Sequence, residues 1–151
     1  MSDPLPIGVP VAELRPTQMT VGFREVEIKR RQWREADEDA RAKLLRRHVV
    51  PAVVGPKGRR YYIVDHHHFT KALLDEKAPL IAIYIVADLE DLAKDEFWAF
   101  LDNSDWCHAY DADGNPRLFN AKEWPDLQAG YRCLPEQRGS GPGWLCWSCL
   151  T

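Results

Sequence analysis

The sequence of 151 residues lacks any long hydrophobic run. Its longest apolar stretch, residues 79–87, has the length of a β-strand and is too short to cross a bilayer. The amino terminus also lacks the basic region, apolar stretch and small-residue cleavage site of a secretory signal. These absences predict a cytoplasmic protein with no membrane partner.

Cysteine is absent from the first 106 residues, and all four cysteines fall in the last third of the chain. A disulfide framework spanning the core would not be distributed in this way, so we expect reduced thiols. Nothing in the composition indicates disorder, because 45% of the residues are hydrophobic and 28% are charged. The length suits one domain with one hydrophobic core.

The sequence lacks an excess of positive charge, because its 23 acidic residues outnumber its 20 basic ones, and the formal net charge of −3 argues against broad electrostatic capture of nucleic acid. Local basic stripes nevertheless occur at residues 29–31, 46–47 and 57–60. Each stripe is either solvated surface or a binding surface, and the sequence leaves both interpretations open.

For the first half of the chain, the sequence pattern predicts an extended segment, two helices and a β-hairpin. After an extended lead-in with a loop at residues 14–18, sparse apolar positions predict an exposed amphipathic helix over residues 24–34. Asp37 can cap a second helix that runs to about His48. Two apolar runs joined by Gly- and Pro-containing turn residues then predict a β-hairpin over residues 51–64.

The second half continues the mixture of helix and strand. Asp65-His66-His67-His68 follows the hairpin, and the apolar spacing of residues 69–74 places a short helix directly after it. Residues 79–86 predict a further strand, and Asp88 is expected to cap the helix that carries residues 97–101. We therefore expect an α+β domain over residues 1–120 and an irregular tail over residues 121–151.

The histidine turn is the candidate functional site. A helix start presents free backbone amides that favour phosphate or another anion. Imidazoles beside those amides could donate to the anion, move a proton, or hold a metal with help from Asp65, His48 or His108. In the alternative interpretation one histidine caps the helix, one packs against a hairpin tyrosine, and one faces solvent without a role. Both interpretations stay open.

Glu25 and Lys29 lie four residues apart on the first predicted helix. They form either an ordinary helical ion pair or a pair that reaches the histidine turn. In the second case a carboxylate would orient an imidazole and raise its basicity.

The stretch over residues 62–73, Tyr-Ile-Val-Asp-His-His-His-Phe-Thr-Lys-Ala-Leu, resembles the ParB-like nuclease family of the ParB/sulfiredoxin superfamily. Residues 14–22 upstream, together with Glu25 and Lys29, fit the same family, and the resemblance covers roughly residues 10 to 120. It implies a small mixed sheet with flanking helices. The family name includes nuclease, an activity that is inferred for the family itself.

In that superfamily the corresponding turn is Gly-Glu-Arg-Arg in ParB proteins and Gly-Cys-His-Arg in sulfiredoxins, where it holds nucleotide phosphates. In relatives that phosphorylate free serine it is Asp-Gly-His-His-Arg. His66 stands at the position of the Gly and Phe69 at that of the last Arg. The sulfiredoxin reaction is excluded because its nucleophilic Cys would be His67, and the missing Arg counts against a kinase.

The resemblance thus implies a domain that binds a phosphate-containing ligand, either nucleic acid or a nucleotide. If the domain is hydrolytic, the residues expected to carry catalysis are Asp65, His67, His68 and Glu25. The residues expected to bind the ligand are His66, Lys29 and Thr70, and a divalent metal is a candidate cofactor. The alternatives are a non-enzymatic nucleotide- or partner-binding regulatory module and, with less support, a small-molecule kinase of the serine type.

The tail becomes rich in Gly, Trp and Cys where family members usually continue with a further helical, aromatic segment. A truncated or frame-shifted segment after Tyr131 is therefore a hypothesis for this part of the chain.

Overall fold

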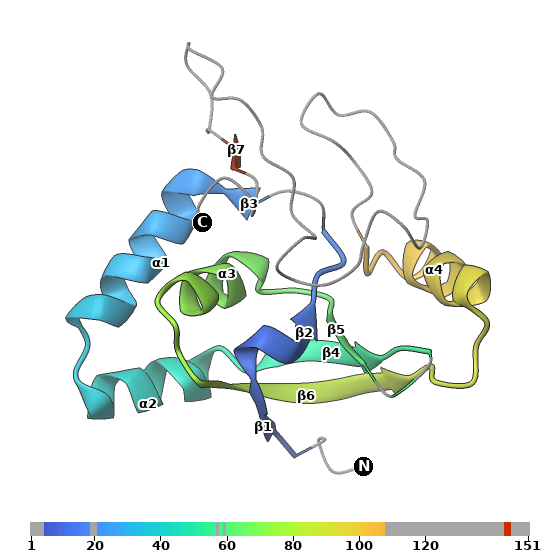
Figure 1. Ribbon diagram of the computed structural model, residues 1–151, viewed down its shortest axis with the longest axis horizontal. Coiled ribbons are helices and arrows are strands. Elements are labelled where there is room, and N and C mark those ends of the chain that lie inside the picture. Colours follow the sequence, from blue (N-terminus) through green and yellow to red (C-terminus); the bar gives the residue numbers. More distant parts are fainter. Residues whose placement is uncertain (1–4, 19–20, 57, 59, 108–143, 146–151) are drawn as a thin grey trace.

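A five-stranded mixed sheet organises the part of the chain that the computed structural model describes, residues 5–18, 21–56, 58, 60–107 and 144–145 (Figure 1). The strand order is β1-β6-β4-β5-β2. Its strands are β1 (Ile7–Pro10), β2 (Leu14–Arg15), β4 (Val50–Val54), β5 (Tyr61–Ile63) and β6 (Leu80–Asp88). With its helices, this sheet confirms the predicted α+β class.

The predicted hairpin is β4 and β5, which pair antiparallel. The Gly55 N–H donates to the Arg60 carbonyl at 2.7 Å and closes the turn between the two strands. The prediction of a loop at residues 14–18 was wrong at its start, since Leu14–Arg15 pairs with β5 in the parallel direction. A strand of two residues is too short for an alternating pattern, so only its pairing with β5 reveals it.

Four α-helices are described, and the first two were predicted correctly. They are α1 (Phe23–Glu35), α2 (Glu38–Arg47), α3 (His67–Asp75) and α4 (Lys94–Asn103). Val26 and Trp33 are the buried apolar residues that α1 turns toward the core. The Asp37 carboxylate accepts from the Ala40 N–H at 2.8 Å, which confirms the predicted cap of α2.

The predicted cap at Asp88 was wrong. Strand β6 continues past the expected end at residue 86, because its pairing with β4 resumes after a bulge and brings Asp88 opposite Val54. The Asp88 carboxylate then accepts from the Glu90 N–H at 3.1 Å, which is a turn contact. Helix α4 begins only at Lys94, with Ala93 as its N-cap.

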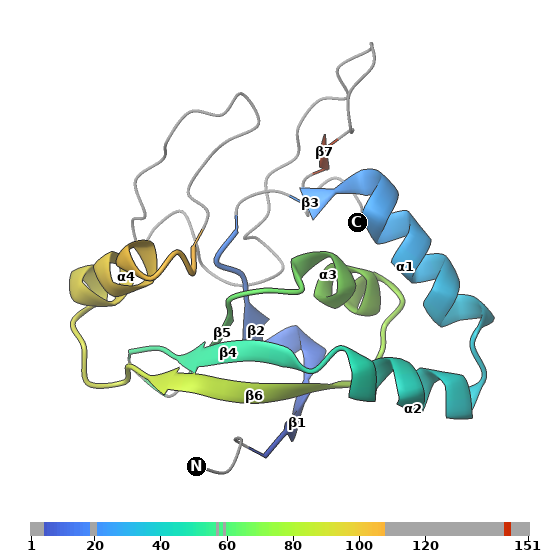
Figure 2. The same cartoon turned by 180° about the vertical axis from the view of Figure 1, so that it is seen from behind.

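The core has two clusters on opposite faces of the hairpin strands. Tyr61 and Ile63 contribute to the cluster beneath α1 and α3, while Tyr62 between them packs in the cluster of α4. Figures 1 and 2 show the result: α1, α2 and α3 gather at one side of the molecule and α4 stands at the other. The histidine turn lies on the side of α1 and α3.

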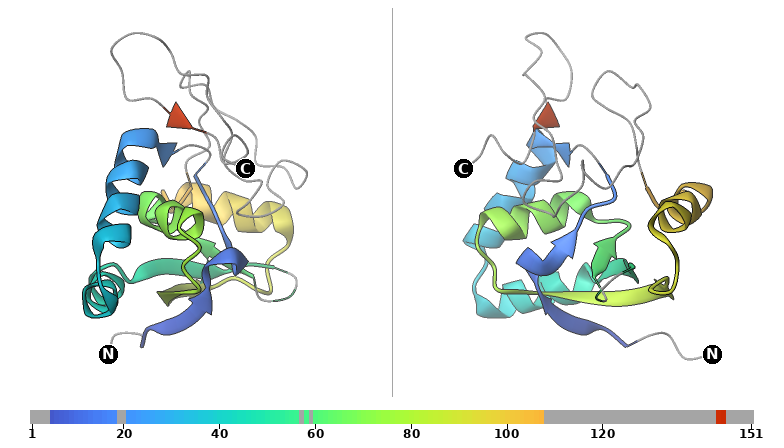
Figure 3. Two further views of the ribbon diagram at one scale, coloured as in Figure 1. Left: turned by 60° about the vertical axis from the view of Figure 1, so that its left-hand side comes forward. Right: turned by 45° about the vertical axis from the view of Figure 1, so that its right-hand side comes forward.

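Residues 21–22, just before α1, lie beside α3 (Figure 3). Here β3 (Val21–Gly22) leads directly into α1 and pairs antiparallel with β7 (Trp144–Leu145). A 3-10 turn, η1 (Val11–Glu13), precedes β2. Within the predicted tail the structure describes only β7, so the boundary at residue 120 and the hypothesis about the tail concern residues outside the described ones. No helix in the described ranges is long and apolar enough to span a membrane.

Candidate functional site

The turn from β5 into α3 places His66 in a left-handed conformation, with φ 58° and ψ 36°. A side chain at such a position costs about 1–2 kcal/mol, whereas glycine adopts the same conformation freely. This backbone gives a physical reason for the Gly that stands here in the resembling turns. In this chain the position carries an imidazole instead.

Two neighbouring side chains hold the backbone of His66 from both sides. The His66 N–H donates to the Asp65 carboxylate at 2.7 Å. The His66 carbonyl accepts from both the backbone N–H and the hydroxyl of Thr70, each at 3.0 Å. Asp65 and Thr70, both predicted site residues, therefore stabilise the left-handed turn.

His67 points away from solvent and is only 5% exposed. Its Nε2 lies 3.5 Å from the Thr17 hydroxyl, which donates its own proton to the Ile63 carbonyl at 2.7 Å. Because that proton is already used, the hydroxyl can only accept from the His67 ring. His67 is thus anchored against the residues that follow β2.

His68 links α3 to the start of α1. Its Nε2 accepts from the Gly22 N–H at 3.0 Å, so in the neutral ring the proton sits on Nδ1, which faces the Glu25 carboxylate at 3.5 Å. Burial lowers the pKa of His68, and the nearby Glu25 carboxylate partly opposes this effect. Glu25 therefore reaches the histidine turn, as one of the two interpretations of its spacing proposed.

Lys29, one helical turn after Glu25, acts on the same region. Burial lowers the pKa of both His48 and His68, and the positive charge of Lys29 lowers each of them further. Lys29 thus supplies a cation on the side of α1 that faces the turn. His66 adds to the lowering of the His48 pKa as well.

The sequence suggested His48 only as an additional metal ligand, and the structure places it close to His66. The two rings are edge to face with centroids 5.8 Å apart, and His48 also packs 4.9 Å from Phe69. Nothing in the spacing of the sequence signals this approach across 18 residues. The antiparallel pairing of β4 and β5 brings it about, since the Val64 N–H donates to the Pro51 carbonyl at 3.0 Å.

Phe69 stands where the resembling turns have Arg, and it is 4% exposed within the larger core cluster. At this position the first turn of α3 therefore has no guanidinium that could bind an anion. It does offer amides: the His66 side chain does not cap the helix, and no acceptor among the described residues binds the N–H groups of His68 and Phe69. These donors lie at the positive end of the helix dipole.

The described residues contain no group of three or more His, Cys, Asp or Glu side chains that could hold a metal ion. His108, proposed from the sequence as an additional ligand, lies outside the described residues, as do three of the four cysteines. The fourth, Cys107, is a free thiol, and burial raises its pKa to about 12. A thiol in this state is a poor nucleophile.

A mixed sheet whose antiparallel hairpin feeds a strand-to-helix turn with open amides defines an α+β domain of the ParB/sulfiredoxin type. Residues 7–126 match the family described as "Putative ParB-like nuclease". The chain therefore belongs to this family, in agreement with the resemblance carried by residues 62–73.

Among solved structures, the chain is similar to protein Atu1540 from Agrobacterium tumefaciens, with a TM-score of 0.73 and 37% sequence identity. The similarity covers 87% of this chain and 63% of that chain, so the present sequence spans less than two thirds of the length of that relative. Comparison with curated proteins finds no match.

Proposed function

We propose that this domain binds a phosphate-bearing ligand, a nucleotide or a nucleic acid, at the amino end of α3. The observation that carries the proposal is the left-handed turn at His66, which leaves the amides of His68 and Phe69 without an acceptor among the described residues. A helix start of this kind favours anions. The cation of Lys29 on the facing helix strengthens the same preference.

The geometry supports different roles for the site residues, some of which position the site while others would contact the ligand. His67, His68 and Glu25 are positioning residues, because Thr17 and Gly22 already engage the ring nitrogens that would act on a ligand. Asp65 and Thr70 fix the His66 backbone. That arrangement leaves the His66 imidazole, the open amides and Lys29 as the groups that would contact phosphate.

Hydrolysis of a phosphodiester is the second candidate function. It is favoured by the pair of half-buried imidazoles, His48 and His66, whose rings lie 5.8 Å apart beside the open amides. Imidazole is the side chain best suited to proton transfer near neutral pH. A divalent metal would have to arrive with the substrate or use groups beyond the described residues.

The binding proposal is tested with His66→Gly and Lys29→Ala. Glycine removes the imidazole while accepting the left-handed conformation, so the fold is retained. We expect Lys29→Ala to weaken binding of a fluorescent nucleoside triphosphate and of inorganic phosphate by roughly fivefold at low salt, the upper range for one exposed charge pair. Lys43→Ala on the exposed face of α2 is the matched control. Binding by Lys29→Ala and His66→Gly as tight as that of wild type would exclude this site.

Product formation separates the enzymatic candidates from a pure binding module. Labelled single- and double-stranded DNA with divalent metals reports nuclease activity, and ATP with free serine reports kinase activity. Cleavage that His66→Gly abolishes supports the hydrolytic function. Thermal stabilisation by nucleotide without any product supports the regulatory module.

A further inference from the structure

A cavity lies at the opposite end of β5 from the histidine turn. It has a volume of about 370 Å³ and is lined by η1, the edge strand β2 and the turn that precedes β5. Because β2 and β5 run parallel, their amino ends meet at this cavity and their carboxyl ends at the turn of His66. One pair of strands therefore connects the two sites.

The cavity is basic and carries an aromatic ring. Arg15 and Arg60 line it, against one carboxylate from Glu13. Tyr61 is half-buried at its wall, and the Arg15 guanidinium lies 5.9 Å from the ring centroid of the adjacent Tyr62. No ion pair within the described part of the chain involves the Arg60 side chain, and in the sequence Arg60 ends the basic stripe that begins at residue 57.

We propose that this cavity is a second contact point for the nucleic acid that the histidine turn binds, and that the ligand is single-stranded. This inference rests on the proposed function and narrows it from any phosphate-bearing ligand to a strand several nucleotides long. Grooves that bind single strands combine positive charge for the backbone with aromatic rings for stacked bases. Arg60 and Tyr61 provide both in one cavity.

The size and position of the cavity explain the preference for a single strand. A volume of about 370 Å³ admits one ligand ring system but not a duplex, whose bases stay stacked inside the helix. From Arg60 to His66 the chain advances six residues, at most about 20 Å when extended. A strand of several nucleotides is therefore long enough to occupy both sites.

The test compares a labelled dinucleotide with an oligodeoxythymidine of about ten residues, a length within the site sizes of single-strand-binding domains. We expect Arg60→Ala to leave dinucleotide binding unchanged and to weaken binding of the longer strand by roughly fivefold at low salt. The slope of log affinity against log salt for the longer strand should fall by about 0.7, the value for one phosphate contact on a single strand.

Glu13→Gln provides the opposite change, because it removes the carboxylate that repels phosphate in the cavity. It should tighten binding of the longer strand without affecting the dinucleotide. Arg46→Ala, an exposed arginine on α2, is the matched control and should behave as wild type. Comparison of Arg60→Ala with Arg46→Ala also tests whether loss of any surface arginine is sufficient to weaken binding of the longer strand.

The outcomes distinguish the two proposals. If Lys29→Ala weakens both ligands while Arg60→Ala and Glu13→Gln match wild type, the second contact point is excluded and the histidine site remains. If Lys29→Ala changes neither ligand, the proposed function fails as well. Equal affinity of wild type for the dinucleotide and the longer strand also overturns the second contact point.

Discussion

Three consecutive histidines have three different surroundings because His66 lies in the left-handed turn before α3, while the step from His67 to His68 rotates the side chain by about 100° around the helix axis. His67 points inward to Thr17, His68 points across to Gly22, and His66 stays at the mouth of the turn. Among the three, only the His66 ring makes no hydrogen bond to the described part of the chain. The residue with the least obvious structural task is therefore the best candidate for contact with a ligand.

His68 makes the stability of the domain depend on pH. Burial lowers its folded-state pKa below the unfolded value of about 6.5, so the folded state binds fewer protons in the interval between the two. The stabilising contribution is complete above pH 6.5 and is lost as the pH falls through the folded pKa. His48 titrates in the same direction.

We predict that His68→Gln reduces this pH dependence, because an amide oxygen can still accept from the Gly22 N–H but does not titrate. The measurement is the free energy of unfolding in urea at several pH values between 7 and 5. The loss should be smaller in the variant than in wild type, with His48 responsible for the remainder. His68→Ala, which leaves Gly22 without an acceptor, should be less stable at every pH; identical pH dependence in all three proteins would contradict the role of His68.

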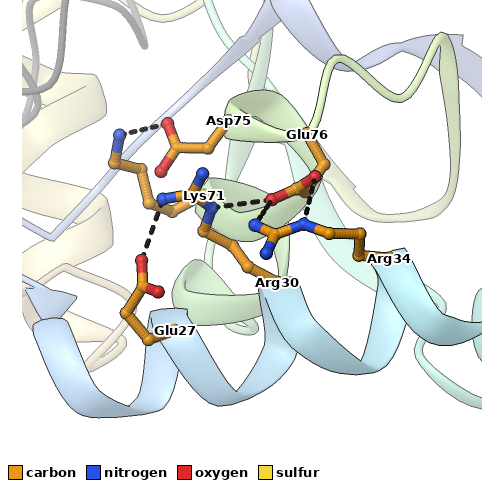
Figure 4. Close-up of polar contacts among 6 residues, drawn as sticks. All are labelled: Glu27, Arg30, Arg34, Lys71, Asp75 and Glu76. Atoms are coloured by element: carbon orange, nitrogen blue, oxygen red, sulfur yellow. Dashed lines mark hydrogen bonds and ion pairs between the residues drawn. The ribbon is translucent and has the colours of Figure 1, made fainter.

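Helices α1 and α3 are joined by charged side chains as well as by apolar packing (Figure 4). The Glu76 carboxylate accepts from Arg30 at 2.9 Å and from Arg34 at 2.6 Å, and Arg30 also pairs with Glu27 at 2.8 Å. The hydrogen bond from Arg34 lowers the pKa of Glu76. The carboxylate therefore stays ionised and holds the two helices in one register.

A second pair, Lys71 and Asp75, lies within α3 on its buried side. The Lys71 ammonium contacts the Asp75 carboxylate at 2.6 Å, and the lysine side chain is only 2% exposed. The other carboxylate oxygen of Asp75 is buried without a hydrogen-bond partner among the described residues. Such a pair contributes little net stability, but breaking it is costly because one charge is left buried.

We therefore predict that Lys71→Met destabilises the domain by about 3 kcal/mol or more, since Asp75 loses its counter-charge. The double variant Lys71→Met, Asp75→Leu removes both charges and should recover more than half of that loss. Urea denaturation of the two variants and wild type measures the difference. A double variant less stable than the single one would contradict the explanation that the unpaired Asp75 charge causes the loss.

On the scale of the whole molecule, Gly55 connects the hairpin to the cluster of α4. A Cβ at this position would fall against the ring of Tyr62. That ring packs 4.8 Å from Phe97 and 5.7 Å from Trp98, the residues that attach α4 to the sheet. The absence of a side chain at Gly55 thus permits the contact between the sheet and its last described helix.

Gly55→Ala should cost about 1–3 kcal/mol through overpacking, and it should change the near-ultraviolet circular dichroism of the aromatic cluster. Gly8→Ala in β1 is the matched control, because a Cβ there meets nothing within 4 Å. The control should be neutral or slightly stabilising. A Gly55 variant with unchanged melting temperature and spectrum would show that Tyr62 moves aside without cost.

The local sequence determined the elements whose cause is local. The sparse apolar positions of α1, the cap at Asp37 and the turn chemistry between β4 and β5 depend on residues within a few positions of one another. The histidine turn is local in the same sense. These features were predictable because spacing and capping act over single helical turns and hairpins.

Tertiary structure alone decided the features that depend on pairing over a distance. The edge strand β2, the extension of β6 to Asp88 and the approach of His48 to His66 all follow from strand register. The separate surroundings of the three histidines likewise depend on which residues α1 and β2 bring near. Periodicity carries no information about partners 18 or more residues away, so only the folded sheet could place them.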